Sequence, residues 1–99
     1  EESGRGTIES LSEVLEGTRS AIPVLIDSGF RRGTDIFKAL ALGATAVGIG
    51  RPYVWGLAAY GEAGAAAVLK ILCDELRTAM RQAGTRNLKE IDRSYIIAR

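Results

Sequence analysis

Two short apolar runs, each ending in glycine and arginine, constrain this chain more than any other feature. The first lies within IPVLIDSGFRRGTD, residues 22–35, and the second is AVGIGRP, residues 46–52. Runs of Val, Ile and Leu without polar alternation are typical of strands buried on both faces. Glycine at a strand end lets a ligand approach the backbone, and arginine offers a fixed set of donors to an anion. Two such strands side by side would form one phosphate site, which suits a phosphorylated cofactor.

The pattern around these runs predicts alternating helices and strands in one undivided domain, residues 1–99. The expected elements are a helix closed by Gly17, a strand over 23–27, a helix capped by Thr34 and closed by Gly43, a strand over 46–49, a short helix over 53–60 after Pro52, a long helix over 62–83 closed by Gly84, and a short helix over 88–92 capped by Asn87. The expected apolar faces are Ile8, Leu11, Val14 and Leu15, then Ile36, Phe37 and Leu40, then Val68, Leu69, Leu72, Leu76, Ala79 and Met80. The two strands form a βαβ unit and should be parallel neighbours.

Composition excludes several classes of function. The formal net charge is +1, with neither a basic stripe nor an acidic block, so we expect no nucleic-acid partner. With no histidine and one cysteine, we expect no metal site and no internal disulfide, and a reducing compartment. The absence of histidine also removes the commonest general base. We expect neither a membrane-spanning helix nor a signal peptide, and a start without Met is not expected to be a natural beginning.

This architecture predicts part of a larger fold. Two parallel strands covered by helices on one side leave the sheet edges unpaired and one face uncovered. We therefore expect the α/β fold to be the C-terminal portion of a (β/α)8 TIM barrel, its last two strands and following helices, incomplete on its own. Phosphate sites in such barrels are commonly built by the loops after strands seven and eight and a short extra helix.

The motifs DSGFRRGTDIFKALALGA and GIGRP, followed by a Gly-Glu-Ala-Gly turn into a long helix, resemble the C-terminal end of a known family. It is the family of FMN-dependent 2-hydroxy acid oxidases and dehydrogenases, which includes glycolate oxidase, lactate oxidase, lactate monooxygenase and mandelate dehydrogenase. The resemblance spans nearly the whole chain and is most specific over residues 27–52. It implies FMN as the cofactor and oxidation of an L-2-hydroxy acid, such as lactate or glycolate, to the 2-oxo acid.

The resemblance also implies which residues meet FMN. Asp27 is expected beside the ribityl hydroxyls, Gly29 where the backbone approaches the phosphate, and Arg31 on the phosphate. Gly50 and Arg51, after the second strand, match the other half of the family's phosphate site. Many relatives have glycine where this chain has Ser28. The predicted cofactor-binding residues are Asp27, Ser28, Gly29, Phe30, Arg31, Gly50 and Arg51.

No residue of this chain is predicted to be catalytic. In the family, the catalytic histidine and the substrate-binding arginine belong to an HGGR-type motif upstream of the matching region. The isolated chain is therefore expected to be inactive and to need the N-terminal part of the same barrel as its partner. The family also implies a small 2-hydroxy acid substrate, with lactate weakly preferred, a homo-oligomer, usually a tetramer, and a cytoplasmic protein, with membrane-peripheral attachment as the alternative.

Two other functions remain open at this stage. One is a non-enzymatic module that self-associates through its strand edges and binds only FMN or phosphate. The other is a different phosphate-binding barrel enzyme, related to inosine monophosphate dehydrogenase or isopentenyl diphosphate isomerase, which the GIGRP and Gly-Glu-Ala-Gly runs disfavour.

Side chains other than the predicted FMN-binding residues are expected to have structural roles. Arg32 is expected to be solvated or salt-bridged, and Cys73 to be a small buried apolar residue. The aromatic residues of the short helix, Tyr53, Trp55 and Tyr60, are expected to pack against the barrel. The charges of the last turn, Lys89, Glu90, Asp92 and Arg93, are expected at the surface.

Overall fold

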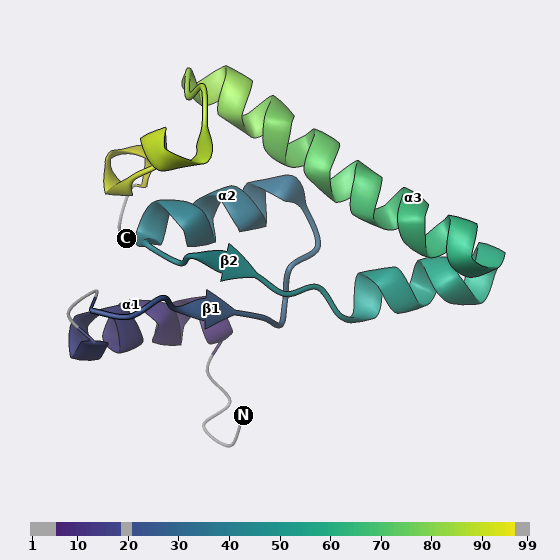
Figure 1. Cartoon of the computed structure of the whole chain (residues 1–99), viewed down its shortest axis with the longest axis horizontal. Helices are drawn as coiled ribbons and strands as arrows, with labels where there is room; N and C mark the ends of the chain where they lie inside the picture. Colours follow the sequence, from purple (N-terminus) through teal and green to yellow (C-terminus); the bar gives the residue numbers. More distant parts are fainter. Residues whose placement is uncertain (1–5, 19–20, 97–99) are drawn as a thin grey trace.

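A computed structural model describes residues 6–18 and 21–96 of the chain. The elements run in the order α1 (Thr7–Thr18), β1 (Leu25–Ile26), α2 (Gly33–Leu42), β2 (Ala46–Val47), α3 (Arg51–Ala83), η1 (Leu88–Glu90) and η2 (Arg93–Tyr95), the last two being 3₁₀ turns. Figure 1 shows α2 beside β2, with the long C-terminal part of α3 returning past α2. The polar start at residues 1–5 and the end of the tail at 97–99 lie outside the described residues.

The two strands pair in parallel, as the βαβ pattern predicts. Leu25 lies opposite Ala46 and Ile26 opposite Val47, so each strand is shorter than expected. Ile26 is 5% exposed and packs with apolar residues of α1, α2 and α3, whereas Leu25 is 72% exposed. The uncovered sheet face that was expected for these two strands alone is therefore present, and burial on both faces stays a prediction for a complete barrel. Helices cover one face of the sheet, and no segment within residues 6–18 and 21–96 covers the other face.

Two helix ends differ from the predictions. Gly17 does not end α1, which continues to Thr18, where the side-chain hydroxyl donates to the carbonyl of Leu15 at 3.2 Å. Thr34 is not the cap of α2, because the helix begins at Gly33 with Arg32 in the cap position. Asp35, the third residue of α2, instead accepts hydrogen bonds from the two backbone N–H groups that precede the helix, as described below. Gly43 ends α2 as predicted, with a left-handed φ of 119°.

Helix α3 is two arms joined by a sharp bend, which matches the predicted pair of helices. Tyr60 and Gly61 leave helical geometry, with φ/ψ of −140°/19° and 65°/−147°. Residues 51–59 form the first arm and residues 62–83 the second. The arms meet at two glycines: a Cβ at Gly56 would overlap the backbone carbonyl of Gly64, and one at Gly64 would overlap the backbone carbonyl of Gly56. Only glycine lets the two backbones approach this closely.

The bend also bears on membrane crossing. Contrary to the sequence prediction, α3 is long and apolar enough to span a bilayer by length and composition, with 17% of its most apolar window buried. However, every 18-residue stretch of α3 with no more than two charged side chains contains Tyr60 and Gly61. The apolar stretch is therefore a hairpin and not one straight helix.

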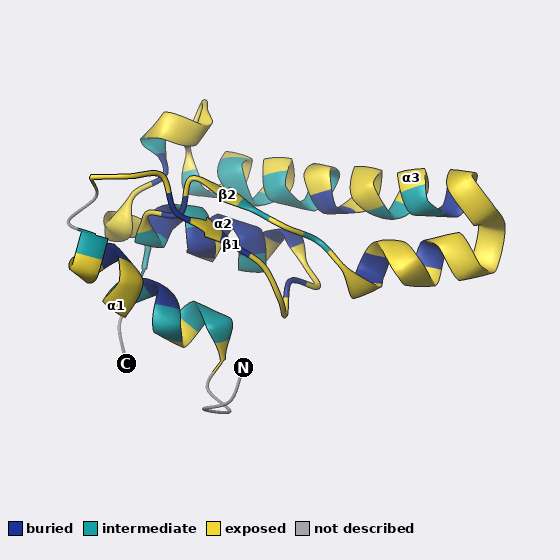
Figure 2. Cartoon of the chain, turned by 60° about the horizontal axis from the view of Figure 1, so that its bottom comes forward, coloured by how far each residue is buried: buried dark blue, intermediate teal, exposed yellow. Residues whose placement is uncertain are grey.

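Most contacts between elements involve α2, which lies in the centre of the packing. By contrast, both arms of α3 consist mostly of exposed residues (Figure 2). A main core joins α1, the sheet and α2 to Leu72, and a smaller one places Phe37 edge-on to Tyr95, with ring centroids 5.7 Å apart. Val14 and Leu69 are 48% and 46% exposed, so the expected apolar faces are narrower than the pattern suggested. Cys73 is exposed, which corrects its prediction as a buried residue.

The C-terminal turn is partly as predicted. Asn87 Oδ1 accepts a hydrogen bond from the backbone N–H of Glu90 at 3.2 Å, which confirms the cap. Within the range of the expected helix, 88–92, the structure has one 3₁₀ turn, η1. A second, η2, follows it and is capped by Asp92, which accepts from the backbone N–H of Ser94 at 2.9 Å.

Candidate functional site

A pocket of about 410 Å³ opens where the carboxyl ends of β1 and β2 meet. The loop after β1 and the loop after β2 both line this pocket, because neighbouring parallel strands end at the same edge of the sheet. The pocket is lined by Asp27, Ser28, Gly29, Phe30, Arg31, Gly48, Ile49, Gly50 and Arg51. The structure thus brings all seven predicted residues together. Sequence reasoning missed Gly48 and Ile49, although both belong to the same GIGRP run as Gly50.

The loop after β1 turns through two successive left-handed residues. Ser28 has a φ of 78° and Gly29 a φ of 85°. A non-glycine residue in this region costs about 1–2 kcal/mol, so glycine would fit position 28 with less strain than serine. Here the Ser28 hydroxyl donates to Asp27 Oδ1 at 3.3 Å, a local bond that offsets part of this cost. At Gly29 an added Cβ would meet no atom within 4 Å, so the backbone there faces open space.

The loop after β2 leads directly into the first turn of α3. Gly48 donates its N–H to the carbonyl of Ile26 at 2.7 Å, and a Cβ at Gly48 would lie 3.1 Å from Asp27 Cβ. This close approach brings the two loops together. Gly50 is the N-cap of α3, and Arg51 and Pro52 are its first two residues. The N-terminus of a helix carries unpaired N–H groups and partial positive charge, and both favour an anion in the pocket.

The charges around the pocket are unevenly distributed. Arg31 and Arg51 are exposed and, in the part of the chain that the structure describes, form no ion pair. Asp27 is the one acidic side chain among the lining residues. By contrast Arg32, the next residue along, is bound to Glu75 with 3.0 Å between Nε and Oε1. The interpretation of Arg32 as a salt-bridged neighbour is confirmed.

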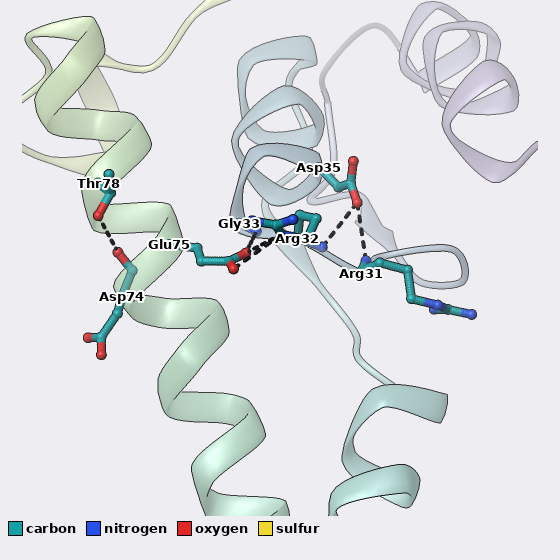
Figure 3. A network of polar contacts seen from close by, with 7 residues as sticks. All are labelled: Arg31, Arg32, Gly33, Asp35, Asp74, Glu75 and Thr78. Atoms are coloured by element: carbon teal, nitrogen blue, oxygen red, sulfur yellow. Dashed lines mark hydrogen bonds and ion pairs between the residues drawn. The ribbon is translucent and has the colours of Figure 1, made fainter.

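Two carboxylates hold the loop that carries Arg31, as Figure 3 shows. Asp35 Oδ2 accepts from the backbone N–H groups of Arg31 and Arg32, each at 3.1 Å. Glu75, on the second arm of α3, accepts from the N–H of Gly33 at 2.8 Å as well as from Arg32. The hydrogen bond from Gly33, reinforced by Arg32, holds the pKa of Glu75 below its usual range, and the same ion pair raises the pKa of Arg32.

Glu75 was not predicted from the sequence, because it lies 42 residues from Gly33 and no local pattern links them. Tyr53, Trp55 and Tyr60 are 40%, 57% and 82% exposed, so other parts of the described chain do not cover them. Their packing against a complete barrel stays a prediction.

Comparisons with known proteins agree with the geometry of this pocket. The family model for FMN-dependent dehydrogenases matches residues 2–98. A peroxisomal (S)-2-hydroxy-acid oxidase from Oryza sativa subsp. japonica is 55% identical over 91 residues, which cover 92% of this chain and 25% of the relative. The chain therefore spans about a quarter of the length of the curated relative.

Solved structures give the same result. A soluble mutant of the membrane-associated (S)-mandelate dehydrogenase from Pseudomonas putida matches with a TM-score of 0.83 and 45% identity, over 89% of this chain and 25% of that one. A lactate oxidase from Pediococcus acidilactici matches with a TM-score of 0.85 and 38% identity, over 90% and 25%. These neighbours are FMN-dependent TIM-barrel enzymes, and the chain matches a fragment of their fold. The pocket, the matched motifs and the extent of the match agree: this chain belongs to the family of FMN-dependent dehydrogenases.

Proposed function

We propose that this chain is the C-terminal part of the FMN-binding (β/α)8 barrel of a 2-hydroxy acid oxidoreductase, and that its pocket holds the FMN phosphate. One observation carries the proposal. Nine residues from two loops, among them the seven predicted ones, line one pocket at the strand ends, and its two arginines have no acidic partner in the described chain. Because an unpaired guanidinium pair suits a dianion, a phosphate group is the ligand that best completes the site.

Each lining residue has a role that its geometry permits. Arg31 and Arg51 would bind phosphate oxygens from opposite loops, and the first turn of α3 would add its dipole. The open backbone at Gly29 and Gly50 leaves room for the phosphate, because a Cβ at either position would meet no atom within 4 Å. Asp27 would accept hydrogen bonds from the ribityl hydroxyls. Its carboxylate is suited to hydroxyl donors and would repel the phosphate itself.

The chemistry that FMN supplies when bound is acceptance of two reducing equivalents from the 2-hydroxy acid. The residues of this chain bind and orient the cofactor. They include no histidine, so the general base is proposed to come from the N-terminal part of the same barrel. We accordingly propose that the 99-residue chain alone does not turn over.

The open face of the sheet supports a larger barrel. Leu25 is 72% exposed, and a shallow pocket of about 320 Å³ runs along both strands. In the complete barrel this face would pack against the layers of side chains inside the barrel. The same exposed face favours the second candidate, a self-associating module that binds only FMN or phosphate. The mass of the purified particle separates them, because a self-associating module consists of 10.6 kDa chains alone.

Activity measurements test the proposed reaction. The complete protein is assayed with glycolate, lactate and mandelate and an artificial electron acceptor, beside the isolated chain. We expect turnover of at least one acid by the complete protein and of none by the chain alone. The relatives act on different acids by name, so lactate stays a weak preference. Turnover by the pure 99-residue chain would refute the assignment of the base to another segment.

Replacing Arg51 tests the phosphate site itself. Losing one hydrogen-bonded charge costs about 1.5–3 kcal/mol, so Arg51→Ala should weaken FMN binding about 10- to 100-fold. Lys38→Ala is the matched control, because Lys38 is an exposed cation on α2 away from the pocket. Equal FMN affinity in the Arg51 variant and the control would refute the site.

Location and assembly are further proposals. We propose a cytoplasmic homo-oligomer, a tetramer by analogy with the family. The names of the relatives include one peroxisomal and one membrane-associated enzyme, so attachment at a membrane surface is the alternative location. Fractionation of cells that express the protein distinguishes the two.

A further inference from the structure

The side chain of Arg31 lies against an aromatic ring instead of an acid. Its guanidinium carbon is 5.0 Å from the centroid of the Trp55 ring. Arg31 belongs to the loop after β1 and lines the pocket, whereas Trp55 belongs to the first arm of α3, so the contact joins that loop to the helix that begins at the pocket. The side chain makes one other described contact, a hydrogen bond from Nη1 to the carbonyl of Phe30 at 3.2 Å.

An aromatic partner has a consequence that a carboxylate would not have. A carboxylate neutralises an arginine and occupies the N–H donors at the edge of the guanidinium plane. A ring beneath the cation attracts its charge but takes none of those donors. Arg32 and Arg31 show both cases side by side: Arg32 is held by Glu75, whereas Arg31 keeps its charge and most of its donors free.

We propose that Trp55 is a positioning residue that holds Arg31 at the pocket, ready to bind the FMN phosphate. The proposal rests on the proposed function. Arginine has a long side chain with many rotamers, and part of that rotamer entropy is lost when the side chain binds an anion. Contact with the ring restricts the side chain before the anion arrives, and this preorganisation favours binding.

The position of Trp55 is fixed by the α3 hairpin and not by burial of its own ring. Trp55 is 57% exposed. Together with Arg31 and Pro52 it lines a groove of about 200 Å³ whose far wall is Val68, Ile71 and Leu72 of the second arm. The adjacent residue, Gly56, packs against the second arm where only glycine fits. The hairpin thus sets where the ring stands relative to Arg31.

The test compares FMN with riboflavin, which lacks the phosphate. The complete protein is stripped of flavin, and both dissociation constants are measured by flavin fluorescence for wild type, Trp55→Leu and Trp55→Phe. A cation–π contact at an exposed site is worth about 2- to 5-fold in affinity. We expect Trp55→Leu to weaken FMN binding by that factor and to leave riboflavin binding unchanged. Trp55→Phe, which keeps an aromatic ring, should bind FMN almost as tightly as wild type. Tyr53→Leu, an exposed aromatic residue on the same arm, should change neither constant.

A double-mutant cycle isolates the contact from any general damage. In an Arg31→Ala background, Trp55→Leu should have no further effect on the preference for FMN. Equal losses for FMN and riboflavin, or an unchanged preference in Trp55→Leu, would overturn the role of Trp55. A wild-type protein that binds riboflavin as tightly as FMN would overturn the phosphate site, and the positioning role with it.

Discussion

Gly33 is the point at which the loop of the proposed phosphate site is fixed to α3. Its N–H donates to Glu75, and a Cβ at this position would overlap the backbone of Glu75 and Leu76. Gly33→Ala should therefore push α2 away from α3 and break the bond to Glu75. Because the obstructing atoms belong to a helix backbone that cannot rotate away, the cost should lie near the upper end of the usual 1–3 kcal/mol for overpacking. Subtracting at most about 1 kcal/mol of improved helix propensity leaves about 2 kcal/mol.

Chemical denaturation of the protein measures this loss. A change of about 2 kcal/mol shifts the unfolding equilibrium about 30-fold and lowers the denaturant midpoint. Gly17→Ala is the matched control, because Gly17 is also helical and an added Cβ there meets no atom within 4 Å. Both changes affect the unfolded chain alike. The control should stabilise the protein by about 0.5–1 kcal/mol. Equal stabilisation by both substitutions would refute the close contact between α2 and α3.

Two further predictions concern α3. Glu75 has a lowered pKa because its carboxylate accepts hydrogen bonds from Gly33 and Arg32. These bonds stabilise the fold fully at pH values above the unfolded-state pKa of Glu75. The stabilisation is lost as the pH falls through the lower folded-state pKa. Glu75→Gln should thus be less stable than wild type at neutral pH and should approach it in acid; a difference that is independent of pH would contradict this. Gly64→Ala should force the two arms of α3 apart at a cost of about 1–3 kcal/mol, measured by denaturation followed by circular dichroism, and an unchanged midpoint would show that the hairpin does not pack as described.

The parts of the fold that follow from local sequence were predictable. Gly43 and Gly84 adopt left-handed φ values and end α2 and α3, and the helix bends at Tyr60 and Gly61, between the two predicted helices. These features depend on residues close together in the chain. A pocket at the strand ends was equally predictable, because the two glycine- and arginine-bearing loops follow neighbouring strands, whereas the seven individual residues were predicted from the family resemblance.

Features that depend on distant contacts were not predictable. Leu25 belongs to an unbroken apolar run, yet it is exposed because no described segment covers that face of the sheet. Cys73 lies beside Leu72 but points to the other side of the helix, where it meets solvent. At the start of α2 the pattern favoured Thr34 as the cap, but the helix begins one residue earlier, at Gly33, and the Asp35 carboxylate reaches back to accept from the N–H groups of Arg31 and Arg32.

The flavin content of the purified protein tests the central claim most directly. The complete wild-type protein and an Arg31→Ala/Arg51→Ala variant are loaded with FMN and dialysed, and their visible spectra are recorded beside their circular dichroism. The account predicts flavin bands at one FMN per protein in the wild type, and their loss from the variant without loss of secondary structure. A folded variant that keeps its FMN, or a folded wild type that never binds it, would contradict the account.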